Sequence, residues 1–117
     1  MLVGEAYWDR RYIESRLKEL HKDGYTVHLQ DRTAEGPGMR IMLVHQLELE
    51  NRFQGYNLDE IHFTYAPSDR EKTTAIIRTT AKKGRVYIQG RKIYDHQQQD
   101  TQQTSEQEGE KQEEING

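Results

Sequence analysis

Apolar residues recur along residues 5–23 with the 3.6-residue period of an α-helix. Four of them fall on one narrow face: Ala6, Ile13, Leu17 and Leu20. Gly24 follows, and glycine is common just past the last turn of a helix. The pattern therefore predicts an N-terminal helix that buries one face.

Two large aromatic residues of this helix, Trp8 and Tyr12, lie one turn apart and off the aliphatic stripe. One interpretation is that they widen the buried face. The other is that they form an aromatic surface that contacts a partner.

Alternating apolar and polar positions then predict three strands, at residues 25–31, 40–52 and 60–66. The long middle segment is ambiguous, because its alternation favours a strand while its Leu, Glu and Gln content favours a helix. Glycine and proline predict a loop at 33–38, and Gly55 predicts a turn at 54–57.

Residues 73–94 are expected to form a β-hairpin with its turn at Lys83-Gly84. A one-residue bulge at Gly90-Arg91 would keep the alternation in register. The apolar residues of this segment would then point into the core: Ala75, Ile77, Val86, Ile88 and Ile93.

A helix followed by strands with short connections predicts antiparallel neighbours. The expected fold class is α+β: an N-terminal helix packed on a roughly five-stranded antiparallel meander sheet. A sheet of this size that curls into a partly open barrel is the alternative.

Composition divides the chain near residue 94. Residues 95–117 hold seven Gln, seven acidic residues and one Lys, and we expect this tail to be disordered. Residues 1–94 are expected to form a single domain, with 16 Lys and Arg against 13 Asp and Glu. The net charge of −3 therefore combines a basic folded part with an acidic tail.

Several classes of protein and site are disfavoured. The chain has no cysteine, no apolar run long enough to span a membrane and no signal peptide, so we expect a soluble cytoplasmic protein. His28, His45 and His62 fall on three separate predicted strands and do not converge, so we expect no metal site and no cofactor. No catalytic motif is present, and we expect a protein that is not an enzyme.

The hairpin carries six basic residues and no acidic one between positions 73 and 94. In the register described above, cations and tyrosines share its outer face. The candidate nucleic-acid-binding residues are Arg78, Lys82, Lys83, Arg85, Tyr87, Gln89, Arg91, Lys92 and Tyr94. Phosphates bind Lys and Arg, and unstacked bases bind aromatic rings, which favours single-stranded DNA or RNA over a duplex. A purely structural explanation is that charged residues protect an edge strand and tyrosine suits a half-exposed sheet.

The sequence therefore predicts a non-catalytic nucleic-acid-binding accessory protein. The alternative is a small protein-binding module, an inhibitor or adaptor of the kind found in viruses and mobile elements, acting through a sheet edge and the Trp8/Tyr12 surface. The acidic tail would compete with nucleic acid for the basic face, recruit a protein partner, or only keep the protein soluble without a specific role. An exposed edge strand would also allow a homodimer.

Overall fold

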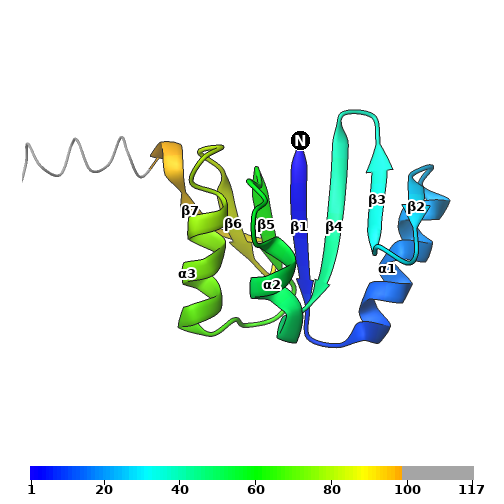
Figure 1. The fold of residues 1–117 in the computed structure, drawn as a ribbon, viewed down its shortest axis with the longest axis horizontal. Helices are drawn as coiled ribbons and strands as arrows, with labels where there is room; N and C mark the ends of the chain where they lie inside the picture. The colour runs from blue at the N-terminus through cyan, green and yellow to red at the C-terminus, as the bar shows by residue number, and fades with distance from the viewer. Residues whose placement is uncertain (99–117) are drawn as a thin grey trace, which may run out of the picture.

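The computed structural model describes residues 1–98, which form an α+β fold around a seven-stranded mixed sheet in the order β2-β3-β4-β1-β5-β6-β7 (Figure 1). Its first elements are β1 (Leu2–Tyr7), α1 (Arg10–Lys22), β2 (Thr26–His28), β3 (Thr33–Gly36) and β4 (Met39–His45). The later ones are the 3₁₀ helix η1 (Gln46–Glu48), α2 (Leu49–Phe53), β5 (Glu60–Phe63), α3 (Asp69–Arg78), β6 (Arg85–Ile88) and β7 (Arg91–Asp95).

The predicted antiparallel meander is wrong, because the centre of the sheet is parallel. β1 lies between β4 and β5 and runs parallel to both, and β6 runs parallel to β5. Only the outer pairs, β2–β3, β3–β4 and β6–β7, are antiparallel. The sheet is open rather than a barrel, since β2 and β7 are its two edges.

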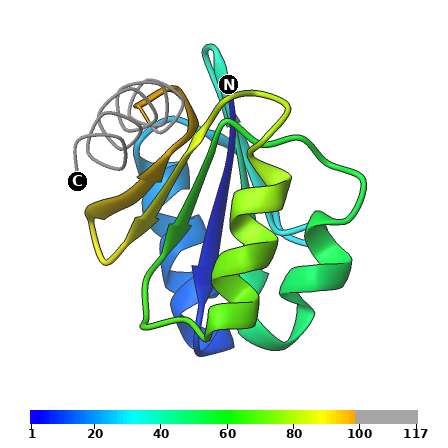
Figure 2. The same cartoon turned by 90° about the vertical axis from the view of Figure 1, so that its left-hand side faces the viewer.

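Helices cover the two faces of the sheet unequally (Figure 2). On one face, α1 packs its buried residues Ile13, Leu17 and Leu20 over the β3-β4-β1 side. On the other face, α2 and α3 pack against β4, β1, β5 and β6, with Phe53 fully buried between α2 and the sheet. The described residues place no helix over β5, β6 and β7 on the α1 side.

The first strand is a second difference from the predicted pattern. Leu2–Tyr7 is a strand, so only the later part of the expected helix at 5–23 is helical. The stripe Ile13, Leu17 and Leu20 is buried as predicted, whereas Ala6 is buried in β1. The expected loop at 33–38 contains β3, which pairs antiparallel with β2 and β4.

The segment 40–52, for which the sequence favoured a strand by alternation and a helix by composition, contains both. Its first half belongs to the strand β4, and its second half forms the helices η1 and α2. Ile41, Met42, Leu43 and Val44 are all buried, because helices cover both faces of this strand. Such a continuous apolar run is typical of a central parallel strand. The expected turn around Gly55 is present, and β5 confirms the predicted strand at 60–66 in its first four residues.

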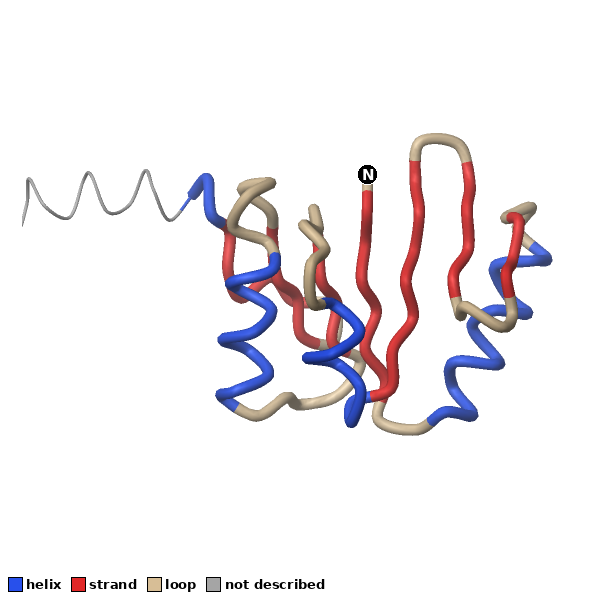
Figure 3. The backbone as a smooth tube through the Cα atoms, viewed as in Figure 1, coloured by secondary structure: helices blue, strands red, loops and turns tan. Residues whose placement is uncertain are grey.

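The largest error concerns residues 73–84, which are not the first strand of a hairpin. Asp69–Arg78 is the helix α3, drawn in blue in Figure 3. A capping box begins it: the Glu71 backbone N–H donates to Ser68 Oγ at 3.2 Å, and the Ser68 N–H donates to Glu71 Oε1 at 2.8 Å. These bonds satisfy backbone donors that a helix start otherwise leaves open.

A hairpin does exist, but it is shorter and its turn lies elsewhere. β6 and β7 are joined at Gln89-Gly90, where φ is 48° and 83°, as a type I′ turn requires. The register shift lies between Val86 and Tyr87 rather than at Gly90-Arg91, and it leaves Ile93 as the extra residue of β7. Ile93 is 38% exposed, so its predicted place in the core is wrong.

The fold also continues beyond the predicted boundary at residue 94. Asp95 ends β7, and His96 is buried with its Nε2 3.0 Å from both Thr79 Oγ1 and the Ile76 carbonyl oxygen. Residues 99–117, which hold most of the predicted acidic tail, lie outside the described residues. None of the helices within residues 1–98 combines the length and apolar character that crossing a membrane would require.

Candidate functional site

The part of the sheet that α1 leaves uncovered, together with the adjoining position on β1, carries a set of polar side chains, which we call the open face. Strand alternation places them on the α1 side, opposite the buried Ile61, Phe63 and Val86. The open face consists of Glu5 from β1, Glu60 and His62 from β5, Arg85 and Tyr87 from β6, and Lys92 from β7.

Four of these side chains form a row across four strands. Glu5 is paired in register with His62, His62 with Tyr87, and Tyr87 with Lys92. The His62 and Tyr87 rings are stacked, with centroids 4.4 Å apart and planes at 3°. Both side chains are half-buried, so an aromatic pair reaches the surface here without any helix above it.

A second row of charges runs beside the first. His62 Nε2 lies 2.9 Å from Glu60 Oε1, and Arg85 forms an ion pair with the other oxygen of Glu60. Lys92 Nζ donates to Asp95 Oδ2 at 3.0 Å. This bond, together with the backbone N–H groups of Gln98 and Gln97, lowers the pKa of Asp95 below its usual range. The cations of the open face are therefore paired within the protein.

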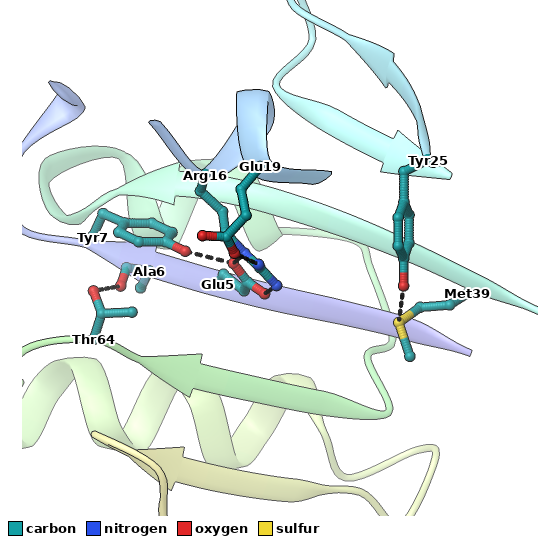
Figure 4. Close-up of polar contacts among 8 residues, drawn as sticks. All are labelled: Glu5, Ala6, Tyr7, Arg16, Glu19, Tyr25, Met39 and Thr64. Carbon is teal, nitrogen blue, oxygen red and sulfur yellow. Dashed lines mark hydrogen bonds and ion pairs between the residues drawn. The ribbon is translucent and has the colours of Figure 1, made fainter. Parts of the chain in front are cut away.

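At the β1 end of the open face lies a compact polar network (Figure 4). Glu5 Oε1 accepts from the Tyr7 hydroxyl at 2.6 Å and from Arg16 Nε at 3.1 Å, while Oε2 accepts from Arg16 Nη2 at 3.1 Å. Arg16 also forms an ion pair with Glu19. Burial, and then the neighbouring Glu5 carboxylate, raise the pKa of the Tyr7 phenol above its usual range, so Tyr7 stays neutral as a donor.

This network borders a shallow depression of about 400 Å³. It lies on the α1 side at the carboxyl ends of β1 and β5, and the β6–β7 turn closes its far side. His62, Thr64 and Gln89 contribute to its lining together with Glu5 and Arg16.

The loops just beyond this edge contain aromatic and acidic residues. Trp8, which follows β1, packs edge-on against Tyr65, which follows β5, with ring centroids 5.8 Å apart. The two helices that begin here are capped by acidic or hydroxyl side chains: Asp9 caps α1, and Ser68 with Glu71 caps α3. Because these caps already occupy helix N-terminal donors, neither start resembles a phosphate-binding turn.

We expect the Asp9 carboxyl to titrate at about pH 2. The Arg11 side chain, followed by the Arg11 backbone N–H, lowers the pKa of Asp9 from 3.8 to about 2. Because the folded-state pKa is depressed, the stabilisation is present above the unfolded value and is lost as the pH falls through about 2. An NMR titration of the side-chain carboxyl carbon measures this directly.

The variant Arg11→Ala should move that midpoint back towards 3.8. Arg10→Ala is the matched control, because the Arg10 side chain pairs with Glu48 instead. An Asp9 midpoint that stays the same in both variants would contradict the assignment to Arg11.

The structure separates the candidate residues that the hairpin model grouped together. Only Arg85, Tyr87 and Lys92 belong to the open face. Tyr94 pairs with Val86, packs towards the α3 side and meets His96 edge-on at 4.7 Å, so its predicted place beside Lys92 is wrong.

The other candidates lie around the ends of β6 and β7. Arg78 is half-buried at the end of α3, and Lys82 and Lys83 are exposed in the turn before β6. Gln89 is exposed in the β6–β7 turn, and Arg91 is exposed directly after it. The predicted interpretation that Trp8 and Tyr12 widen the buried face is wrong, because they are 61% and 59% exposed.

The three histidines that were considered as metal ligands are dispersed: β2 carries His28, β4 ends at His45, and β5 carries His62. Three strands lie between β2 and β5, so His28 and His62 are farther apart than in the predicted strand order. Within residues 1–98 no group of three or more His, Asp or Glu side chains is arranged to hold a metal ion.

The chain matches no family model, no curated protein and no solved structure. Its function is therefore inferred from the geometry of the site.

Sequence reasoning missed Glu5, Arg16, Glu60 and His62 as neighbours of Tyr87. The alternation within each strand places His62 and Tyr87 on the outward face, and this pattern could have identified each of them as a candidate. Their contact depends on the parallel pairing of β5 with β6, which the predicted meander did not contain.

Proposed function

We propose that the chain is a non-catalytic nucleic-acid-binding protein that holds a single strand across its open face. The observation that carries this proposal is the stacked His62–Tyr87 pair on the uncovered part of the sheet. Aromatic side chains on a sheet surface stack with unpaired bases in several single-strand-binding folds, and each stacked base contributes ~1–3 kcal/mol.

The distribution of charge supports the same surface. Residues 59–98 hold eight Lys and Arg against five Asp and Glu, and residues 78–92 hold six basic residues and no acidic one. Lys82 and Lys83 lie in the turn before β6, and Arg91 and Lys92 lie at the start of the antiparallel β7. Cations therefore flank the aromatic pair at both ends of the hairpin.

The ion pairs of the open face are compatible with this role. Exposed ion pairs contribute only ~0–1 kcal/mol, so a phosphate can replace a carboxylate as the partner of Lys92 at little cost. The acids of the open face each bond to a neighbouring side chain, which supports a role in holding those side chains in place. A single strand is favoured over a duplex because stacking on Tyr87 needs an unpaired base.

We expect Tyr87→Ala to weaken single-strand binding by about 5- to 150-fold, which corresponds to the stacking of one base. The salt dependence of binding should stay unchanged, because the phosphates keep all their cationic partners. Fluorescence anisotropy with labelled ssDNA, RNA and dsDNA, titrated in salt, measures both quantities. Tyr12→Ala is the matched control. Tyr12 is 59% exposed on α1, outside the open face, so its removal should leave the single-strand affinity unchanged.

The double variant Arg91→Gln with Lys92→Gln should instead change the salt dependence of binding, which Tyr87→Ala leaves unchanged. It should lower the slope of log affinity against log salt by ~0.7 for each phosphate that the protein no longer neutralises. Lys18→Gln with Lys22→Gln removes the same charge from α1 and should leave the slope unchanged. Absence of affinity for every oligonucleotide at ~50 mM salt would disprove the proposal.

A protein-binding module is the second candidate, supported by the exposure of Trp8 and Tyr12 next to the Trp8–Tyr65 contact. Exposed aromatic residues are common at the centres of protein interfaces. A stoichiometric protein partner that survives nuclease treatment and no longer binds the Trp8→Ala variant would favour this candidate. The edge-strand homodimer stays a prediction, although a three-residue β2 and a bulged β7 are poor templates for pairing.

A further inference from the structure

The depression beside the open face occupies a position where sheets of this kind bind ligands. The chain leaves β1 for α1 on one face, and leaves β5 for α3 on the other, so these neighbouring strands send their connections in opposite directions. In open sheets with parallel strands, ligands bind outside the carboxyl ends at such a point. The depression of about 400 Å³ lies at these strand ends.

One wall of the depression is a flat ring. His62 lines it, whereas Tyr87 does not. Tyr87 covers one side of the imidazole at 4.4 Å, so only the other side of the ring is left for a ligand in the depression. A planar ligand placed there would extend the Tyr87–His62 stack by one layer.

Next to His62, at the paired position of β1, lies the Glu5 carboxylate, a hydrogen-bond acceptor with remaining capacity. Glu5 Oε1 accepts two hydrogen bonds, while Oε2 accepts one, from Arg16 at 3.1 Å. A carboxylate oxygen has about two acceptor sites, so Oε2 can accept one more bond. The ligand must therefore present a donor to Glu5.

Gln89 adds a group that can both donate and accept. Its backbone N–H is fixed by the Phe63 carbonyl oxygen at 2.7 Å, while its side chain is exposed and makes no hydrogen bond to the described residues.

Two acids, Glu5 and Glu19, surround the single cation Arg16. This balance disfavours a phosphate in the depression and favours a neutral ring.

We propose that the depression holds one nucleobase that carries an exocyclic amino group, turned out of the strand bound by the open face. This rests on the proposed function, because the strand delivers the base. Adenine and cytosine present an amino donor where thymine and uracil present a carbonyl oxygen, which Glu5 would repel. Arg91 follows the Gln89-Gly90 turn directly and would take the adjoining phosphate.

Two measurements on the full chain test this. Anisotropy with labelled oligo-dA, oligo-dC and oligo-dT at one salt concentration should show at least about fivefold tighter binding of dA or dC than of dT. NMR titration with adenosine, cytidine and uridine should shift the amide signals of Glu5, Thr64 and Gln89 for the first two nucleosides only.

The Gln89→Ala variant should reduce the preference over oligo-dT to less than about twofold while leaving the salt slope unchanged. Gln54→Ala is the matched control, because Gln54 is an exposed glutamine in the turn after α2 and should keep the preference. Glu5→Gln replaces the acceptor with an amide that also donates, and in a folded sample it should shift the preference towards oligo-dT.

The outcomes separate this inference from the proposed function. Oligonucleotide binding that depends on Tyr87, with equal affinity for dA, dC and dT and no effect of Gln89→Ala, would overturn the base site and leave the function standing. Shifts of the Glu5 and Gln89 amide signals on adding nucleosides, without oligonucleotide binding, would support the base site and refute the proposed function. If neither oligonucleotide binding nor nucleoside-induced shifts are observed, both the base site and the proposed function are overturned.

Discussion

Gly84→Ala should destabilise the fold by ~3 kcal/mol or more, because an added Cβ would lie 2.2 Å from the Asp59 carbonyl oxygen and 2.8 Å from its carbon. Backbone atoms cannot move aside as the end of a side chain can. The same carbonyl oxygen accepts the Arg85 N–H at 3.0 Å, and the Gly84 carbonyl oxygen accepts the His96 N–H at 3.1 Å. Relief of the clash would therefore disturb the start of β6 and the attachment of His96 together.

Urea unfolding at constant pH measures this cost, and Gly55→Ala is the matched control. Gly55 has φ of +84° and no atom within 4 Å of an added Cβ, so its substitution costs only the strain of a left-handed alanine, ~1 kcal/mol. Equal losses of stability in the two variants would show that β6 does not pack against Asp59 as closely as described.

Phe53→Ala should cost ~3–5 kcal/mol, the largest destabilisation we expect from truncating a single side chain. Phe53 is fully buried in the core between the sheet and α2, and it is among the largest side chains there. Its ring closes over the backbone of β1: a Cβ added to Gly4 would lie 2.6 Å from Phe53 Cζ and 2.9 Å from Leu58 Cδ2. Gly4→Ala alone should therefore be destabilising by ~1–3 kcal/mol through overpacking.

The double variant Gly4→Ala with Phe53→Ala should be destabilised by less than the two single variants combined. The new methyl group occupies space that the ring vacates, so the coupling should be ~1–2 kcal/mol in the favourable direction. Gly4→Ala with Leu20→Ala is the control pair, because Leu20 belongs to the core on the α1 side and the two effects should simply add. Additive effects in the Phe53 pair would contradict the contact between α2 and β1.

The parts of the fold that follow from local pattern were predictable from the sequence. The apolar stripe of α1 and the alternation of Ile61, Phe63 and Tyr65 correctly identified buried faces, because each depends on a single element. The parallel centre depends on pairing between distant segments. Its local signal was the unbroken run from Ile41 to Val44, which is typical of a strand covered on both faces.

The misassigned helix α3 shows how composition can hide a start signal. Its sequence is rich in Thr and Ile, which favour strands. Ser68 and Glu71, three residues apart, are nevertheless the two members of a capping box. The box and the packing of Ala75 into the core stabilise a helix that residue preference alone does not favour.

The candidate site was predictable only in part for the same reason. The outward direction of Tyr87 and the basic character of residues 78–92 were visible in the sequence. The neighbours of Tyr87 come from β1 and β5, so they could be identified only after the strand order was known. Glu5 was assigned to a helix, which concealed its place on the same sheet face as His62.

The central position of β1 also has a consequence for the order in which the chain folds. Leu2 pairs with Arg40 and Val3 with Glu60, so both neighbours of this strand come from much later in the chain. Contacts of such sequence separation form slowly, because the intervening loop must be closed first. During synthesis Leu2–Tyr7 therefore has no strand partner until β4 has been made, so a strand made first cannot be the first to join the sheet.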